Sequence, residues 1–92
     1  MSRLRIIIRG RVQGVFFRSS ASELARSLQL TGYVRNRIDD SVELVAEGEP
    51  QTLLVLREWS RHGPAGAVVE SIEEIVEAET GEFATFYVRG SI

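Results

Sequence analysis

The most constraining feature of this sequence is a change of hydrophobic period between residues 4 and 28. Leu4, Ile6 and Ile8 are apolar while Arg3, Arg5 and Arg9 are charged, and this period of two predicts a strand with one buried face. From Ala21 to Leu28 apolar side chains instead recur at intervals of three and four, which predicts an amphipathic helix. The segment Gly10–Arg18, which contains two glycines, must therefore lead from a strand into a helix.

A strand–helix junction can direct several backbone N–H groups, and the positive end of the helix, at one anion. Arg18 stands where the helix is expected to begin, and its guanidinium is a planar set of donors that suits phosphate or carboxylate. The candidate anion-binding residues are Gln13, Gly14, Val15, Phe16, Phe17 and Arg18. Similar junctions also occur in α/β proteins with no anion site, so geometry alone leaves both interpretations open.

A hairpin and a second helix are expected next. Two strands, around Tyr33–Arg35 and Val42–Ala46, flank a polar turn at Arg37–Ser41 and predict a β-hairpin. The helix is expected to begin at Pro50, a favourable first-turn residue, and to end before Gly63. Its predicted buried face consists of Thr52, Val55, Leu56 and Trp59.

Residues 68–76 and 83–89 predict two closing strands joined by a Glu-rich turn. The predicted order is then β-α-β-β-α-β plus an extra short strand. This order is typical of a ferredoxin-like α+β sandwich, in which two helices cover one face of a largely antiparallel sheet. A chain of 92 residues has room for one core, so residues 1–92 are expected to form a single domain.

Composition argues against several classes of protein. The sequence has no cysteine, which removes disulfides, a thiol nucleophile and cysteine-bound metals. It has no apolar run long enough to cross a membrane and no signal-peptide pattern, so we expect a cytoplasmic protein that does not bind membranes. The net charge of −2 argues against bulk binding of nucleic acid.

The charges are unevenly distributed along the chain. Residues 1–37 contain eight Arg and one acidic residue, whereas residues 38–92 contain three Arg and twelve acidic residues. A positive field around the candidate anion site would attract anionic substrates. Alternatively, the two halves interleave in the folded chain and their charges cancel, and the sequence favours neither arrangement.

Three segments resemble motifs of the acylphosphatase family. Gly10–Arg18 closely resembles the family signature and is the most specific match. Gly32–Asn36 is a second match at the expected distance, and Gly63-Pro64 with the later Phe86–Arg89 is a third, weaker one. The resemblance covers essentially the whole chain and implies the same ferredoxin-like fold.

The resemblance also implies an enzyme that hydrolyses the carboxyl–phosphate bond of small acyl phosphates. In this family the motif Arg binds the phosphate and the motif Asn positions the attacking water, and the matching residues are Arg18 and Asn36. The side-chain chemistry agrees, because phosphoryl transfer depends mainly on positioning and electrostatics, and an Asn amide can orient a neutral water. We expect a monomer without metal or cofactor, with inorganic phosphate as product and competitor.

A covalent phosphoenzyme is not expected. Cysteine-dependent phosphatases place a Cys six residues before the Arg, and Val12 occupies that position here. The segment Gly10–Arg18 also contains no Asp that could carry a phosphoryl group. Direct attack by water is the more economical route.

Other interpretations of the same residues stay open. Arg18 can be a surface residue beside a helix, and Asn36 can simply end a strand. The aromatic segment 81–88 loosely resembles the base-stacking strand of RNA-recognition modules. A third possibility is an acylphosphatase-like domain that binds carbamoyl phosphate or another anion without turnover.

Two residues depart from the family pattern, and one helix start is ambiguous. Gln29 and Asp40 stand where the family usually has glycine, and a left-handed backbone would cost Gln29 up to roughly 1–2 kcal/mol. Ser20 and Glu23 fit a capping box, which would start the first helix two residues after Arg18.

Overall fold

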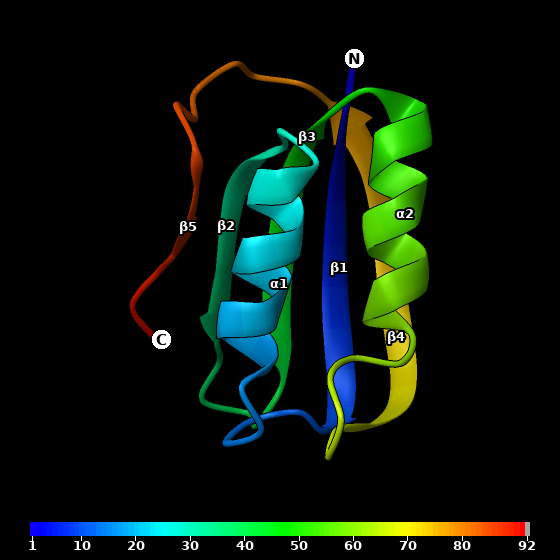
Figure 1. Ribbon diagram of the computed structural model, residues 1–92, viewed down its shortest axis with the longest axis vertical. Helices are drawn as coiled ribbons and strands as arrows, with labels where there is room; N and C mark the ends of the chain where they lie inside the picture. The colour runs from blue at the N-terminus through cyan, green and yellow to red at the C-terminus, as the bar shows by residue number, and fades with distance from the viewer. Residues whose placement is uncertain (92) are drawn as a thin grey trace.

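The computed structural model describes residues 1–91, which contain five strands and two helices (Figure 1). In chain order these are β1 (Ser2–Arg11), α1 (Phe17–Ser27), β2 (Thr31–Asn36), β3 (Val42–Gly48), α2 (Pro50–Ser60), β4 (Val68–Ala78) and β5 (Phe86–Val88). The predicted order of elements is confirmed, although β4 is longer and β5 shorter than expected. Neither helix in this part of the chain is long and apolar enough to cross a bilayer.

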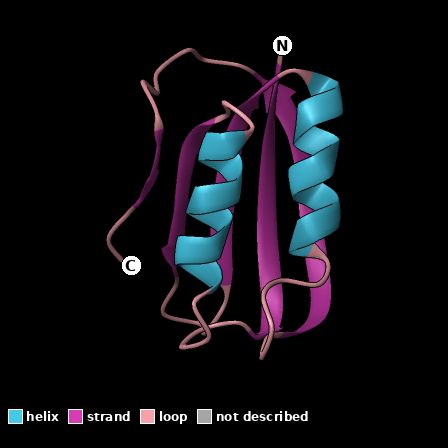
Figure 2. Ribbon diagram, in the orientation of Figure 1, coloured by secondary structure: helices cyan, strands magenta, loops and turns pink. Residues whose placement is uncertain are grey.

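The strands form one sheet in the order β4-β1-β3-β2-β5. β1 is antiparallel to both β3 and β4, β2 is antiparallel to β3, and β5 runs parallel to β2. Both helices cover the same face of the sheet (Figure 2). The fold is therefore the predicted ferredoxin-like α+β sandwich with a mostly antiparallel sheet.

The core lies between the sheet and the two helices. β1 contributes Leu4, Ile6 and Ile8, the alternating positions that the sequence predicts to be buried. α1 contributes the small residues Ala21 and Ala25, which let its backbone approach the sheet closely. Burying one large aliphatic side chain contributes about 1.5–3 kcal/mol, so this cluster is the main stabilising feature of the fold.

α2 buries a different face from the one predicted. Leu53, Leu56 and Ser60 are buried, whereas Val55 is 48% exposed. Leu56 is thus confirmed as a core residue and Val55 is not, while Trp59 packs against the core from a partly buried position. Residues 53–56 are apolar on every side of the helix, so their pattern does not identify the face that meets the sheet.

α1 begins at Phe17, which places Arg18 in its first turn. Its N-cap is Phe16, in a left-handed conformation with φ 63° and ψ 24° and with no side-chain cap. Ser20 lies inside the helix, where its N–H donates to the Phe16 carbonyl at 3.1 Å. The capping box formed by Ser20 and Glu23 is therefore wrong.

Both residues that stand at family-glycine sites have a left-handed backbone. Gln29 has φ 58° and Asp40 has φ 70°. After α1, the N–H of Leu30 donates to the Ala25 carbonyl at 2.9 Å and that of Gln29 to the Arg26 carbonyl at 3.0 Å. This pair of hydrogen bonds is a Schellman motif, which requires the left-handed residue at Gln29.

The aromatic segment near the C-terminus supplies an edge strand. β5 lies at one end of the sheet, and Phe86 is fully buried in the core. Tyr87 packs against Tyr33, with ring centroids 6.3 Å apart. A base-stacking surface needs exposed rings on an internal strand, so the position of β5 argues against the RNA-recognition interpretation.

The charges of the two chain halves interleave on the sheet. Glu43 is 5% exposed and forms ion pairs with both Arg5 and Arg35. Burial alone would raise the pKa of the Glu43 carboxyl, but the hydrogen bond and charge of Arg35, together with Arg5, hold it below its usual value. Arg3 likewise forms ion pairs with three acidic residues on later segments, Glu47, Glu77 and Glu82. The nearest of them is Glu82, at 2.8 Å. Much of the charge asymmetry is therefore cancelled by folding.

A β-bulge ends the regular part of β1. The register with β4 shifts between Arg9 and Gly10, and Gly10 has φ 130°. A Cβ atom at Gly10 would lie 2.1 Å from the carbonyl oxygen of Val68, so only glycine fits there. Bulges bend the strand that carries them, and this one precedes the segment that leads from β1 to α1.

Candidate active site

A cavity of about 340 Å³ opens where the segment after β1 meets the start of α1, the end of β2 and β5. It is lined by Val12, Gly14, Phe16, Phe17, Arg18, Ser19, Asn36 and Val88. The two predicted catalytic residues, Arg18 and Asn36, thus face one cavity from different elements. Of the predicted binding residues, Gln13 and Val15 are not part of its lining.

The segment between β1 and α1 presents unused backbone donors. Across residues 1–91, no N–H of residues 13–19 donates to a backbone carbonyl. Gly14 has φ 75°, a left-handed conformation that glycine adopts without strain. The first turn of α1 contains no acidic residue, so the positive end of the helix dipole is not neutralised there. This side of the cavity has the character of an anion site.

Arg18 is a partly buried cation without a carboxylate partner. Within residues 1–91 no acidic oxygen lies within 4.0 Å of its guanidinium nitrogens. By contrast, Arg9 pairs with Asp39 at 3.1 Å and with Glu73 at 3.3 Å. The guanidinium of Arg18 is therefore available to an anion in the cavity.

Asn36 is the last residue of β2, where it is paired with Val42 of β3. Its side-chain oxygen Oδ1 is buried and has no hydrogen-bond partner within residues 1–91. A buried polar atom without a partner costs about 1–3 kcal/mol, which is why such atoms are rare in folded proteins. Asn36 is also one of the residues that line the cavity, so its side-chain amide lies beside the space that a bound molecule would occupy.

The side chain of Gln13 ties the segment after β1 to the β2–β3 turn. Its Nε2 donates to the carbonyl of Arg37 at 2.9 Å and to that of Ser41 at 3.0 Å. Because Arg37 directly follows Asn36, this bridge sets the position of Asn36 relative to the backbone donors.

Asp39 holds the same turn from its other side. The Ser41 hydroxyl and backbone N–H both donate to Asp39 Oδ1, and Arg9 Nη1 donates to Oδ2 at 3.1 Å. These contacts with Ser41, reinforced by Arg9, hold the pKa of the Asp39 carboxyl well below its usual range. Asp39 is thus a structural carboxylate that supports the turn after Asn36.

Comparison with known proteins identifies a family for this sequence and this fold. The sequence matches the family model described as Acylphosphatase over residues 4–88. A curated acylphosphatase from Marinobacter nauticus is 45% identical over 86 residues, covering 94% of each chain. The crystal structure of acylphosphatase from Bacillus subtilis aligns with a TM-score of 0.92 at 34% identity, covering 97% of this chain and 99% of the other.

The chain belongs to the acylphosphatase family.

Family membership makes this chain an acylphosphatase, an enzyme that hydrolyses small acyl phosphates.

The same fold also occurs inside larger proteins. The crystal structure of full-length HypF, in a phosphate- and nucleotide-bound form, aligns with a TM-score of 0.87 at 31% identity. The alignment covers 98% of this chain but 12% of that chain.

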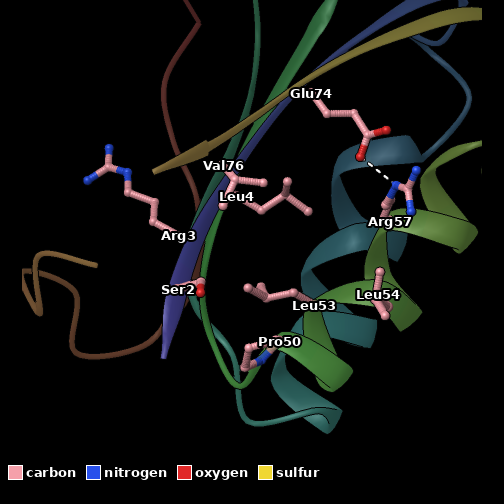
Figure 3. A pocket seen from close by; sticks show the side chains of 9 residues that line it. All are labelled: Ser2, Arg3, Leu4, Pro50, Leu53, Leu54, Arg57, Glu74 and Val76. Atoms are coloured by element: carbon pink, nitrogen blue, oxygen red, sulfur yellow. Dashed lines mark ion pairs between the residues drawn. The ribbon is translucent and has the colours of Figure 1, made fainter. Parts of the chain in front are cut away.

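A second cavity, of about 460 Å³, lies between α2 and strands β1 and β4 (Figure 3). Its walls include the apolar side chains of Leu53, Leu54 and Val76. The charged side chains at this cavity already have partners, because Arg57 pairs with Glu74 and Arg3 pairs with acidic residues on later segments. Although larger, this cavity has no cation without an acidic partner among residues 1–91, in contrast to the cavity at Arg18.

Several residues of the site were not identified from the sequence. Val88 and Ser19 line the cavity, and Gln13 contributes a side-chain bridge in addition to the backbone donor expected of it. The family resemblance at Phe86–Arg89 was the one signal that pointed toward Val88. No local pattern indicates that β5 pairs with β2 and so brings Val88 to the cavity.

Proposed function

We propose that Arg18 and the backbone N–H groups of residues 13–19 hold the phosphoryl group of an acyl phosphate, while Asn36 orients the water that attacks it. The observation that carries this proposal is that Arg18 and Asn36 line one cavity. Within residues 1–91 Arg18 has no acidic partner and the amide oxygen of Asn36 has no hydrogen-bond partner. The phosphoryl dianion complements the charge of Arg18, and a water molecule complements the amide of Asn36.

The proposed reaction is a direct displacement at phosphorus. The oxygen of the water forms a bond to phosphorus while the bond between phosphorus and the acyl oxygen breaks. The electron pair of that bond leaves with the carboxylate, a good leaving group that does not require a general acid. One proton of the water passes to a phosphate oxygen, so that the products are a carboxylate and inorganic phosphate.

Asn36 suits a role with water because its amide carries both a donor and an acceptor and does not titrate near neutral pH. Arg18 suits the phosphoryl group because it stays charged and offers several donors in a fixed plane. Catalysis then rests on positioning and on electrostatic stabilisation of the phosphoryl oxygens, as is usual for phosphoryl transfer.

The test is hydrolysis of benzoyl phosphate, followed by ultraviolet absorbance in the presence of a metal chelator. We expect turnover by the wild type that the chelator does not reduce, and a loss of about 100-fold or more in kcat for Asn36→Ala. Gln51→Ala, which shortens an exposed amide side chain on α2, is the matched control and is expected to keep wild-type activity.

Absence of turnover by a folded wild type would contradict the proposal. In that case binding of carbamoyl phosphate without hydrolysis would favour an anion-binding domain, the role open to an acylphosphatase-like unit within a larger protein. Sensitivity to the chelator would contradict the expectation that no metal takes part. The monomeric state and the cytoplasmic location remain predictions from the sequence.

A further inference from the structure

The start of α1 is built differently from an ordinary helix N-terminus. Its N-cap is Phe16, whose backbone is left-handed, with φ 63° and ψ 24°, and whose side chain caps no N–H group. An ordinary N-cap is a Ser, Thr, Asp or Asn with an extended backbone, and its side-chain oxygen accepts a hydrogen bond from an early helical N–H. A left-handed backbone is rare for a bulky residue, and such strain persists only where the surrounding structure holds it.

Ser19 holds this residue through its carbonyl group. The Ser19 hydroxyl donates to the carbonyl oxygen of Phe16 at 3.2 Å, and the N–H of Ser20 donates to the same oxygen at 3.1 Å. Both lone pairs of the carbonyl oxygen are therefore used. Ser19 is exposed and lines the cavity that Arg18 and Asn36 also line. Its hydroxyl thus fixes a backbone group beside the candidate active site.

The core holds the same peptide unit from its other end. Phe17 is 1% exposed, and its ring packs against that of Trp59 with centroids 5.0 Å apart. The backbone of Gly63 passes close to this ring, and a Cβ atom at Gly63 would lie 2.6 Å from Phe17 Cε2. The side chain of Phe17 is therefore fixed in the core, and the peptide that links it to Phe16 is held at both ends.

A peptide unit held at both ends points its N–H in a fixed direction. The peptide is planar and trans, so the N–H of Phe17 points away from the carbonyl oxygen of Phe16. That oxygen faces into α1, where Ser19 and Ser20 donate to it, so the N–H of Phe17 faces out of the start of the helix. No backbone carbonyl within residues 1–91 accepts this N–H, and Phe17 lines the cavity.

We propose that Ser19 is a positioning residue for the reaction: its hydroxyl acts through the Phe16 carbonyl to direct the N–H of Phe17 at the phosphoryl group. This inference rests on the proposed function, because it requires the phosphoryl group to lie at Arg18 and the first turn of α1. Loss of the hydroxyl lets the peptide rotate. A hydrogen bond to an anion weakens when its N–H is misaligned, so phosphate affinity falls.

Ser27 provides a matched control on the same helix. Its hydroxyl donates to the carbonyl of Leu24 at 2.6 Å, again three residues earlier, and Ser27 is exposed as Ser19 is. Ser27 is the last residue of α1 and does not line the cavity. Ser19→Ala and Ser27→Ala therefore remove the same kind of hydrogen bond from opposite ends of α1. A general effect of this loss on the helix would appear in both variants.

The first test is inhibition of benzoyl phosphate hydrolysis by inorganic phosphate. For Ser19→Ala we expect the phosphate inhibition constant and KM to rise about three- to tenfold, with kcat within about twofold of the wild type. This split follows because the phosphoryl group is held less well in the ground state and in the transition state alike. Ser19→Thr keeps the hydroxyl and should restore the wild-type values, and Ser27→Ala should retain them.

Three results of this test would overturn the inference. They are an unchanged phosphate inhibition constant in Ser19→Ala, an equal rise in Ser27→Ala, and a Ser19→Thr variant no better than Ser19→Ala. Because Ser19 is exposed, Ser19→Ala is expected to fold, and urea unfolding should give similar midpoints for Ser19→Ala and Ser27→Ala.

The second test observes the donor itself by proton–nitrogen NMR spectroscopy. Saturating phosphate should move the amide proton signal of Phe17 downfield in the wild type, because the N–H gains a hydrogen bond to an anion. In Ser19→Ala the shift at saturation should be less than about half of the wild-type shift, since the N–H is no longer aligned with the anion. Ser27→Ala should keep the full shift.

The outcomes separate this inference from the proposed function. A full Phe17 shift in Ser19→Ala would overturn the positioning role of Ser19. A wild type that binds phosphate without a shift of the Phe17 signal would overturn it too, and this measurement needs no variant. A wild type that neither binds phosphate nor hydrolyses benzoyl phosphate would overturn the proposed function, and the inference with it.

Discussion

The side-chain amide of Gln13 donates to the carbonyl of Ser41 at 3.0 Å and thereby joins the two segments that carry the proposed catalytic groups. One segment supplies backbone donors and leads to Arg18, and the other begins at Asn36. The same nitrogen also donates to the backbone carbonyl of Arg37 at 2.9 Å. Under the proposed mechanism, the geometry between the bound phosphoryl group and the attacking water therefore depends on Gln13, a residue outside the cavity lining.

Replacement of Gln13 by Ala should lower catalysis more than phosphate binding. Loss of the bridge lets Asn36 shift relative to the phosphoryl group, and small displacements of reacting groups can lower rates by about 10- to 100-fold. We expect a fall in kcat of this size and a phosphate inhibition constant within about threefold of the wild type. Gln51→Ala is the control, and an unchanged kcat in Gln13→Ala would argue against the positioning role.

Two neighbouring residues of α2 should differ in their contribution to stability. Leu56 is fully buried, so Leu56→Ala should lower the free energy of unfolding by about 2–5 kcal/mol. Val55 is 48% exposed, and Val55→Ala should cost less than about 1 kcal/mol. Urea unfolding of both variants tests which face of α2 is buried. Equal losses would support the face predicted from the sequence instead.

Gln29 tests the cost of a left-handed residue after α1. With φ 58° at this position, Gln29→Gly should raise the free energy of unfolding by about 1 kcal/mol, because glycine adopts the conformation without strain. The same change in the first turn of α2, Gln51→Gly, should not raise stability and should lower it by less than about 1 kcal/mol. Thermal or urea unfolding measures the stability of both variants. If Gln29→Gly were less stable than the wild type, the left-handed backbone at Gln29 would not be a source of strain.

Asp39 should make stability depend on acid pH. Its pKa is lower in the folded chain than in the unfolded one, so its contribution is complete above the unfolded value of about 4 and is lost as pH falls toward the folded value. Asp39→Asn should therefore be less stable than the wild type near neutral pH, and the difference should shrink as pH falls below about 4. Urea unfolding of the wild type and of Asp39→Asn across this pH range measures the difference in their free energies of unfolding.

The control for this experiment is Asp40→Asn, a change of the same kind at the adjacent exposed residue. This variant keeps the contacts of Asp39 with Ser41 and Arg9 and is expected to retain the wild-type decline in acid. A difference between Asp39→Asn and the wild type that stays constant with pH would contradict the role assigned to the Asp39 carboxylate.

Local patterns predict the strands, the helices and the segment that leads from β1 into α1, because alternation in β1 and the spacing of Ala21 and Ala25 directly reflect burial. They do not predict the face of α2, since residues 53–56 are apolar in every direction. Contacts such as Gln13 to Ser41 join residues far apart in the sequence and become visible only when the sheet register is known. The position of Val88 depends likewise on the pairing of β5 with β2.

The most direct test of the central claim is the affinity for inorganic phosphate, measured by calorimetry for Arg18→Ala and Asn36→Ala. Arg18→Ala should weaken phosphate binding about 10- to 100-fold, because it removes charge-assisted hydrogen bonds to the anion. Asn36→Ala should bind phosphate within about threefold of the wild type while its kcat falls about 100-fold or more. Arg61→Ala, on an exposed arginine after α2, is the control for loss of charge. Equal losses of phosphate affinity in Arg18→Ala and Asn36→Ala would contradict the division between a residue that holds phosphate and a residue that orients water.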